Sequence, residues 1–263
     1  MKTLKDRYED VGPRWQQNFS SIRRPDLFGK FIDVIEPILN AESENIRVLG
    51  LMSGDAGFEF YFANHLVDLN KGVELDILDF SSTMLEVVKS MEGIVLRKII
   101  GDVRYTKIEG EYDFIILKFG LHDLPREDQH LLLQNIPRLM SENGRLILIV
   151  FFSPTGEAQI HYNNILEKKD ELSGYKTQRH FVTLGEIIDI LIRAGLKPRI
   201  EMLSESNINY FKTELLDSES RKAFGAKLFQ MNIFAGIDAL LGITHTADGP
   251  EITFPLAVIT AKK

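Results

Sequence analysis

The feature that most constrains the fold is an alternation of short β-branched runs with segments of helical periodicity. This alternation is typical of stacked βα units, whose strands pair in parallel. The runs read as strands cover residues 46–52, 73–80, 93–99, 112–119 and 145–152. The fourth and fifth are continuous apolar stretches, as expected of strands buried on both faces of a sheet.

Helical periodicity fills the intervals and the flanks of these strands. Helices are expected over 25–39, 58–70, 82–90, 125–142, 183–194 and 218–234. Asn143-Gly144 is read as a helix stop, and 153–179 as a polar stretch that breaks the alternation. Two later strands are expected at 198–203 and 252–261, and Pro255 suggests that the last is an edge strand or contains a bulge.

Composition excludes several classes of function. The chain has 263 residues and no cysteine, so disulfides, cysteine nucleophiles and thiolate metal sites are absent. Its 38 acidic and 31 basic residues give a net charge of -7, which disfavours nucleic acid as a partner. The start has no apolar signal region and the longest apolar run, 146–152, is too short to span a bilayer. We expect a cytoplasmic protein without membrane insertion.

The first expected strand leads into a turn of small residues, LGLMSGDAGFEF. A strand, a tight turn and a helix N-terminus leave backbone N–H groups free to face a ligand. Gly54 and Gly57 permit close backbone approach. Taken alone, the turn also fits a simple connection between a strand and a helix.

Two further strand ends carry carboxylates. Asp79 ends the second strand, where it could accept both hydroxyls of a ribose, and Phe80 beside it could cover a purine. Asp102 ends the third strand, where it could accept a hydrogen bond from an adenine amine. The plainer alternatives are a helix cap for Asp79 and a solvated turn for Asp102. Three such ends at one sheet edge favour a nucleoside site.

Together these motifs resemble the class I S-adenosylmethionine (SAM)-dependent methyltransferases, particularly the small-molecule branch that includes quinone methyltransferases. VLGLMSGDAG is similar to their glycine-rich motif, LDFSSTMLEVVK to their second-strand motif and IIGDV to their adenine motif. EYDFIILKFGLHDLP and LMSENGRLILIVF are similar to their fourth and fifth strands. The resemblance covers about residues 25 to 263 and is strongest over 46–152.

The resemblance implies a Rossmann-like, doubly wound, mostly parallel seven-stranded α/β sheet with helices on both faces. It divides the chain into a helical lid (1–45), a SAM-binding core (46–152), a variable substrate-side insert (153–182) and the rest of the sheet domain (183–263). The cofactor would be SAM, leaving S-adenosylhomocysteine as product. The implied cofactor-binding residues are Gly50, Met52, Ser53, Gly54, Asp55, Asp79, Phe80, Met84, Gly101, Asp102, Val103, Lys118, Phe119 and Gly120.

The glycine-rich motif departs from the family pattern at three positions. Gly50 stands where the family has an acid that helps to hold the methionine ammonium, and Met52 and Ala56 replace two glycines. Asp55 is a candidate substitute for the missing acid. The departures also leave open a homologue that binds SAM without transferring methyl groups, with another reaction or a regulatory or scaffolding role.

The acceptor side of the site is less defined. His122 is the candidate general base, with a structural histidine as the alternative. Tyr8, Trp15, His161 and Tyr162 are candidate substrate-pocket residues, which could instead be packing or solvated residues. No histidine pair has metal-ligand spacing, so no metal is expected. Phe211, Phe224, Phe229, Met231 and Phe234 could form core, an acceptor pocket or a homodimer face.

The sequence therefore predicts a SAM-dependent methyltransferase acting on a small, partly apolar metabolite. The rivals are the SAM-binding homologue without transfer and a methyltransferase for protein or RNA. A nicotinamide dehydrogenase is disfavoured, because LMSGDAG lacks the G-x-G-x-x-G spacing.

Overall fold

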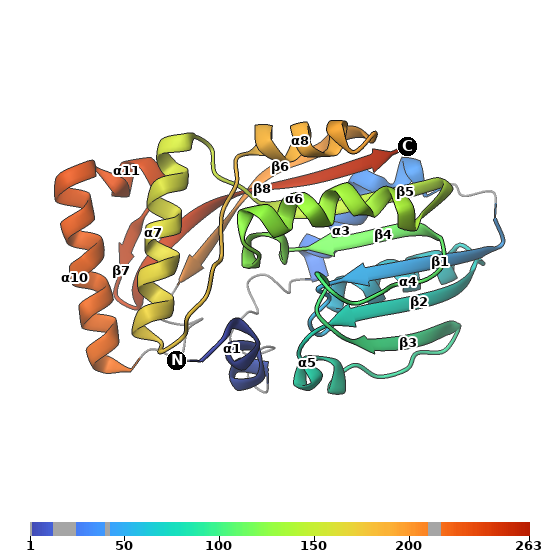
Figure 1. Cartoon of the computed structure of the whole chain (residues 1–263), viewed down its shortest axis with the longest axis horizontal. Coiled ribbons are helices and arrows are strands. Elements are labelled where there is room, and N and C mark those ends of the chain that lie inside the picture. Colours follow the sequence, from blue (N-terminus) through green and yellow to red (C-terminus); the bar gives the residue numbers. More distant parts are fainter. Residues whose placement is uncertain (1, 13–24, 40–42, 210–216) are drawn as a thin grey trace.

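The structure, a computed structural model, describes residues 2–12, 25–39, 43–209 and 217–263. One eight-stranded sheet lies at its centre (Figure 1). Its strand order is β3-β2-β1-β4-β5-β8-β6, and the short β7 pairs with β8. The strands are β1 Asn45–Leu51, β2 Gly72–Asp79, β3 Ile94–Ile100, β4 Tyr112–Lys118, β5 Met140–Phe151, β6 Lys197–Asn209, β7 Thr244–Thr246 and β8 Gly249–Lys262.

The first five strands pair in parallel, whereas β8 runs antiparallel to both of its neighbours. The chain moves outward from β1 to β3, then returns to place β4 on the other side of β1. This reversal creates a switch point between β1 and β4, where open parallel sheets bind ligands at the carboxyl ends of their strands.

Helices flank both faces of the sheet (Figure 1). They are α1 Leu4–Val11, α3 Pro25–Ile35, α4 Gly57–Asp68, α5 Ser82–Glu86, α6 Arg126–Asn135, α7 Gly156–Leu172, α8 Leu184–Arg193, α10 Ser218–Ala235 and α11 Ile237–Leu241. The expectation of a mostly parallel α/β sheet with helices on both faces is confirmed, but the sheet has eight strands rather than the expected seven, because the short β7 adds to the edge of β8.

Alternate residues of the central strands feed two separate cores. Ile116 of β4 belongs to the cluster formed with α3, α4, α7 and α10, while its neighbour Ile115 belongs to the cluster formed with α6 and α8. Successive strand side chains point to opposite faces, so a strand that is covered on both faces has apolar residues at consecutive positions. The apolar runs in β4 and β5 follow from this burial.

The helix expected over 125–142 ends early. α6 stops at Asn135, a 3-10 turn covers Ile136–Leu139, and β5 begins at Met140. Pro137 lacks the amide donor that would continue the α-helix. Asn143-Gly144 is therefore not a helix stop but part of β5, where a Cβ on Gly144 would lie 2.8 Å from the Tyr112 carbonyl oxygen.

Two further expectations need correction. Pro255 does not mark an edge strand, because β8 lies between β5 and β6; Pro255 sits just beyond the last β5 pair, Phe151 with Leu256. The polar stretch 153–179 contains α7, a 17-residue helix capped by Thr155. Its buried residues Ala158, Tyr162, Ile165 and Leu166 have helical spacing, which is the signal that identifies it.

The late aromatic residues divide between core and surface. Phe224 and Met231 of α10 are buried, whereas Phe229 and Phe234 are exposed; Phe211 lies outside the described residues.

Within the described ranges, no helix has the length and apolar character needed to cross a membrane.

Replacing Phe62 with alanine tests the core beneath the site. Phe62 is fully buried on α4, and its ring centroid lies 5.1 Å from that of Phe114. We expect Phe62→Ala to lower the free energy of unfolding by about 3–5 kcal/mol, measured by urea denaturation followed by circular dichroism. Phe229→Ala removes a ring that is 65% exposed and should change it by at most about 0.5 kcal/mol. Equal losses in the two variants would contradict this packing.

Candidate functional site

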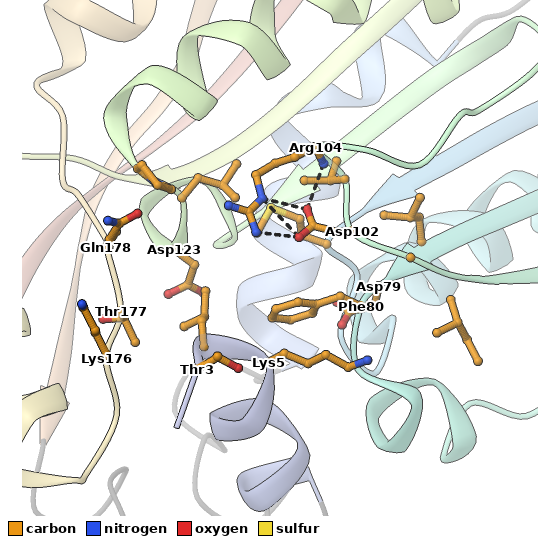
Figure 2. Close-up of a pocket in the computed structure, with 18 residues that line it drawn as sticks. Thr3, Lys5, Asp79, Phe80, Asp102, Arg104, Asp123, Lys176, Thr177 and Gln178 are labelled. Atoms are coloured by element: carbon orange, nitrogen blue, oxygen red, sulfur yellow. Dashed lines mark hydrogen bonds and ion pairs between the residues drawn. The ribbon is translucent and has the colours of Figure 1, made fainter. Parts of the chain in front are cut away.

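A cavity of about 580 Å³ opens at the carboxyl ends of the parallel strands (Figure 2). Its walls come from the β1–α4 turn, the ends of β2 and β3, helix α1, the Asp123–Pro125 turn and residues 176–178. The cofactor residues expected from the sequence that line it are Met52, Asp79, Phe80, Gly101, Asp102 and Val103. Its size is that of a small-molecule or cofactor site.

The β1–α4 turn has an unusual backbone for its sequence. Met52, Gly54 and Ala56 all have positive φ, at 54°, 56° and 53°. A side chain raises the energy of this left-handed conformation, so Met52 and Ala56 hold the geometry that glycine adopts without strain. The turn therefore keeps a glycine-type shape despite the two replacements. Gly50 and Ser53 lie at its base, and Asp55 accepts a 3.3 Å hydrogen bond from the Gly57 N–H.

Asp79 joins the tips of the first two strands. Its Oδ2 accepts a 2.7 Å hydrogen bond from the Gly54 N–H, and its Oδ1 accepts a 2.9 Å bond from the Ser81 N–H. Burial raises the pKa of Asp79 to about 6, although both hydrogen bonds oppose that shift. A carboxylate offers about four acceptor positions, so Asp79 has capacity left for two hydroxyl donors from the cavity.

Asp102 is held by Arg104, which the sequence did not single out. The Arg104 side chain donates to both carboxylate oxygens of Asp102, at 2.6 to 3.2 Å, and also to Asp128 at 3.1 Å. Burial would raise the pKa of Asp102, but the Arg104 hydrogen bonds outweigh it and keep that pKa below its usual value. An adenine amine would have to share this carboxylate with Arg104.

Helix α1 forms one side of the cavity. Thr3, Leu4 and Lys5 line it, and Figure 2 shows Thr3 and Lys5 below Phe80 and Asp123. Further along α1, the Tyr8 hydroxyl donates to Asp123, and Glu9 accepts hydrogen bonds from the first backbone N–H groups of α5. The amino-terminal segment is thus fixed to both sides of the cavity.

A buried set of charges supports the opposite wall. Arg179 bonds Asp170 at 2.6 Å and Asp123 at 3.2 Å, and all three side chains are at least 95% buried. Burial opposes ionisation of Asp123, but the charges of Arg179 and Arg7 and the hydrogen bond from Tyr8 keep the pKa of Asp123 below its usual value. No local sequence pattern indicates this set, because Asp123 lies 56 residues from Arg179 and meets it only in the fold.

His122 does not line the cavity. Its ring stacks on Phe181 at 4.9 Å with an interplanar angle of 3°, and its Nε2 lies 3.8 Å from Asp123 Oδ1. Burial lowers the pKa of His122 to about 4. A neutral, stacked imidazole corresponds to the structural alternative rather than to a general base poised near neutral pH.

The other acceptor-side candidates are dispersed. Tyr8 meets Phe80 with ring centroids 5.7 Å apart, next to the cavity. Tyr162 is buried in the core and donates to the Thr253 carbonyl oxygen at 2.8 Å, and His161 lies in a groove between α7 and α10. Neither lines the cavity at the sheet edge, and Trp15 lies outside the described residues.

Four further cofactor candidates do not line the cavity: Met84, Lys118, Phe119 and Gly120. Met84 is buried, and its Cε would lie 3.0 Å from a Cβ on Gly54. Phe119 stacks on Phe151 at 4.5 Å, with the Lys118 ammonium over its face. Gly120 faces Met52 so closely that a Cβ there would lie 2.7 Å from the Met52 Cβ. In the described part of the chain, no three acidic or histidine side chains are grouped to hold a metal.

Comparison with solved structures identifies the fold, although no protein-family profile and no curated protein sequence matches the chain. A candidate methyltransferase from Bacillus halodurans C-125 superposes with a TM-score of 0.71 and 13% identity, over 89% of this chain and 99% of that one. YcgJ from Bacillus subtilis gives 0.69 and 16%, over 88% and 97%. Magnesium protoporphyrin IX methyltransferase (ChlM) from Synechocystis PCC 6803, solved with bound S-adenosylhomocysteine, gives 0.54 and 14%, over 97% of both chains.

These likenesses show that the chain has the class I methyltransferase fold, as the sequence predicted. In all three, the similarity covers at least 88% of this chain. At 13% to 16% identity the comparisons establish the fold alone.

Replacing His122 tests whether it is held neutral. The pKa of His122 is about 4 in the folded chain and about 6.5 when unfolded. The unfolded state therefore binds more protons between these values, and stability falls as the pH drops from 6.5 to 4, by about 3 kcal/mol for this group. His122→Gln should remove that contribution, leaving a shallower acid-side slope in urea denaturation. An identical slope in wild type and variant would contradict the burial.

Proposed function

We propose that the protein is a SAM-dependent methyltransferase that acts on a small acceptor with polar and apolar parts. The observation that carries the proposal is the cavity at the carboxyl edge of a methyltransferase-type sheet, where Asp79, Phe80 and Gly101 meet at the ends of β2 and β3. ChlM, which shares the fold, was solved with S-adenosylhomocysteine. The residues present in this cavity fit the same class of cofactor.

The nucleoside end would be held at the tips of β2 and β3. Asp79 has acceptor capacity for the two ribose hydroxyls, while its bonds to Gly54 and Ser81 fix its orientation. The Phe80 ring and Val103 provide apolar contact for a purine beside Gly101. A charged acceptor that is already oriented binds hydroxyls without reorganisation.

The acceptor would lie toward α1 and residues 176–178. That side combines the polar side chains of Thr3, Lys5, Lys176 and Gln178 with the apolar Leu4, Leu124 and Pro125. The mixture suits a molecule that is partly apolar with a polar group. The acidic balance of the chain disfavours RNA or DNA in this position.

Catalysis would depend on alignment and exclusion of water. SAM supplies an electrophilic methyl group when bound, so a base is needed only for acceptors that must lose a proton. Asp123 lines the cavity, but its lowered pKa makes it a weak base. Helix α1 covers one side and limits the access of water to the bound molecules. We infer that the acceptor arrives as a competent nucleophile.

The test of function separates methyl transfer from simple binding. Purified protein is incubated with methyl-labelled SAM and a metabolite extract, and S-adenosylhomocysteine and labelled products are measured. Formation of both supports the methyltransferase. Binding of SAM by calorimetry without any product favours a cofactor-binding homologue, and absence of binding rejects both.

Asp79→Asn tests the nucleoside site. The amide keeps the shape but removes the charge that receives the hydroxyls, so affinity for S-adenosylhomocysteine should fall by about tenfold or more. Because the pKa of Asp79 is about 6, adenosine affinity of the wild type should also weaken as the pH falls below 6, and the variant should lack this dependence. Asp189→Asn, on the exposed side of α8, is the matched control for isothermal titration calorimetry. Unaltered affinity in Asp79→Asn would contradict the assignment.

A further inference from the structure

Gly50 leaves a space at the tip of β1 that a helix residue fills. A Cβ on residue 50 would lie 2.8 Å from the Glu59 Cγ, 3.4 Å from Glu59 Oε1 and 2.4 Å from the Ser53 Oγ. Glu59 belongs to the first turn of α4. Its side chain therefore reaches back under the β1–α4 turn and occupies the volume that a side chain on the strand would take.

The Glu59 carboxylate is buried and has no hydrogen bond to another described residue. Its exposed fraction is 0%, and its own backbone N–H is the one hydrogen-bond donor in the described part of the chain that acts on it; the buried Ser53 Oγ beside it is unpartnered. No ion pair within 4.0 Å reaches Glu59 from the described part of the chain. Buried carboxylates without partners are strongly disfavoured, so this pair of oxygens calls for a further donor.

The surrounding charges favour a cation. Lys118 on β4 is the positive group facing Glu59, and Asp55 of the turn and Asp79 at the end of β2 are the negative ones. Three carboxylates and one ammonium leave an excess of negative charge here. Asp79, one of the three, lines the cavity proposed for the nucleoside.

We propose that Glu59, assisted by the Ser53 hydroxyl, accepts hydrogen bonds from the primary ammonium group at the amino-acid end of the cofactor. This inference rests on the proposed function and goes beyond it, because it moves the ammonium acceptor from strand β1 to helix α4. Gly50 is the residue that makes room for the exchange. Asp55, the substitute suggested by the sequence, accepts a hydrogen bond from the Gly57 N–H at the start of α4.

The assignment also couples cofactor binding to a proton. Burial raises the pKa of Glu59 to about 7, while Lys118 opposes the rise and Asp55 and Asp79 add to it. An ammonium beside the carboxylate favours the ionised form. Binding near pH 6.5 should then release a proton from Glu59.

Two ligands isolate the ammonium contact. S-adenosylhomocysteine carries the amino-acid end, whereas 5′-methylthioadenosine has the same nucleoside without it. In calorimetry, Glu59→Gln should lower affinity for S-adenosylhomocysteine by about tenfold to a hundredfold, the range for a hydrogen bond to a charged group, and leave 5′-methylthioadenosine unchanged. Asp68→Asn, an exposed carboxylate on the same helix, should change neither.

Proton release gives an independent measurement. Titrations at pH 6.5 in buffers of different ionisation enthalpy report the protons released on binding. Wild type should release more protons with S-adenosylhomocysteine than with 5′-methylthioadenosine, and Glu59→Gln should remove that difference. Circular dichroism and thermal unfolding verify that the variant is folded.

Each other outcome overturns the inference in a recognisable way. Equal affinity of wild type and Glu59→Gln for S-adenosylhomocysteine, or equal proton release by the two proteins, removes Glu59 from this role. A parallel loss for both ligands in a folded variant assigns Glu59 to the shape of the turn. If wild type binds neither ligand, the proposed function itself fails.

Discussion

The double pairing of β1 is the constraint on which the site depends. β1 is hydrogen-bonded in parallel to β2 on one side and to β4 on the other, and its side chains feed the cores on both faces. Its tip is therefore fixed relative to the ends of β2 and β4. The bond from Gly54 to Asp79 then ties the turn after β1 to the end of β2. Every proposed cofactor contact is positioned from this junction.

The sequence anticipated the sheet because its determinants are local. Runs of β-branched residues, a small-residue turn and carboxylates at strand ends are each readable within about ten residues, and parallel pairing brings such ends to one edge. This reasoning located Asp79 and Gly101 at the cavity. The same reasoning placed the end of the helix at residue 142, too far beyond Asn135, because the periodic leucines continue past Asn135 while Pro137 ends the helical hydrogen bonding.

The parts that were not anticipated depend on contacts between distant segments. Asp123 meets Tyr8 and Arg179 across 115 and 56 residues of sequence, and no local pattern reports such a meeting. Glu59 is a different case: it falls within the helix expected over 58–70, and only the structure shows that its side chain fills the space beside Gly50. The same glycine that read as a loss in the motif is what admits the carboxylate from the neighbouring helix.

Helix α1 has a consequence for the rate of ligand exchange. It is bonded to the start of α5 through Glu9 and to the far wall through Tyr8, Asp10 and the backbone of Lys2, which pairs with residues 174 and 176. These contacts lie on opposite sides of the cavity, so a nucleoside that entered past α1 would require the contacts on one side to break. Association would then approach a ceiling set by this step, and further ligand would no longer hasten it.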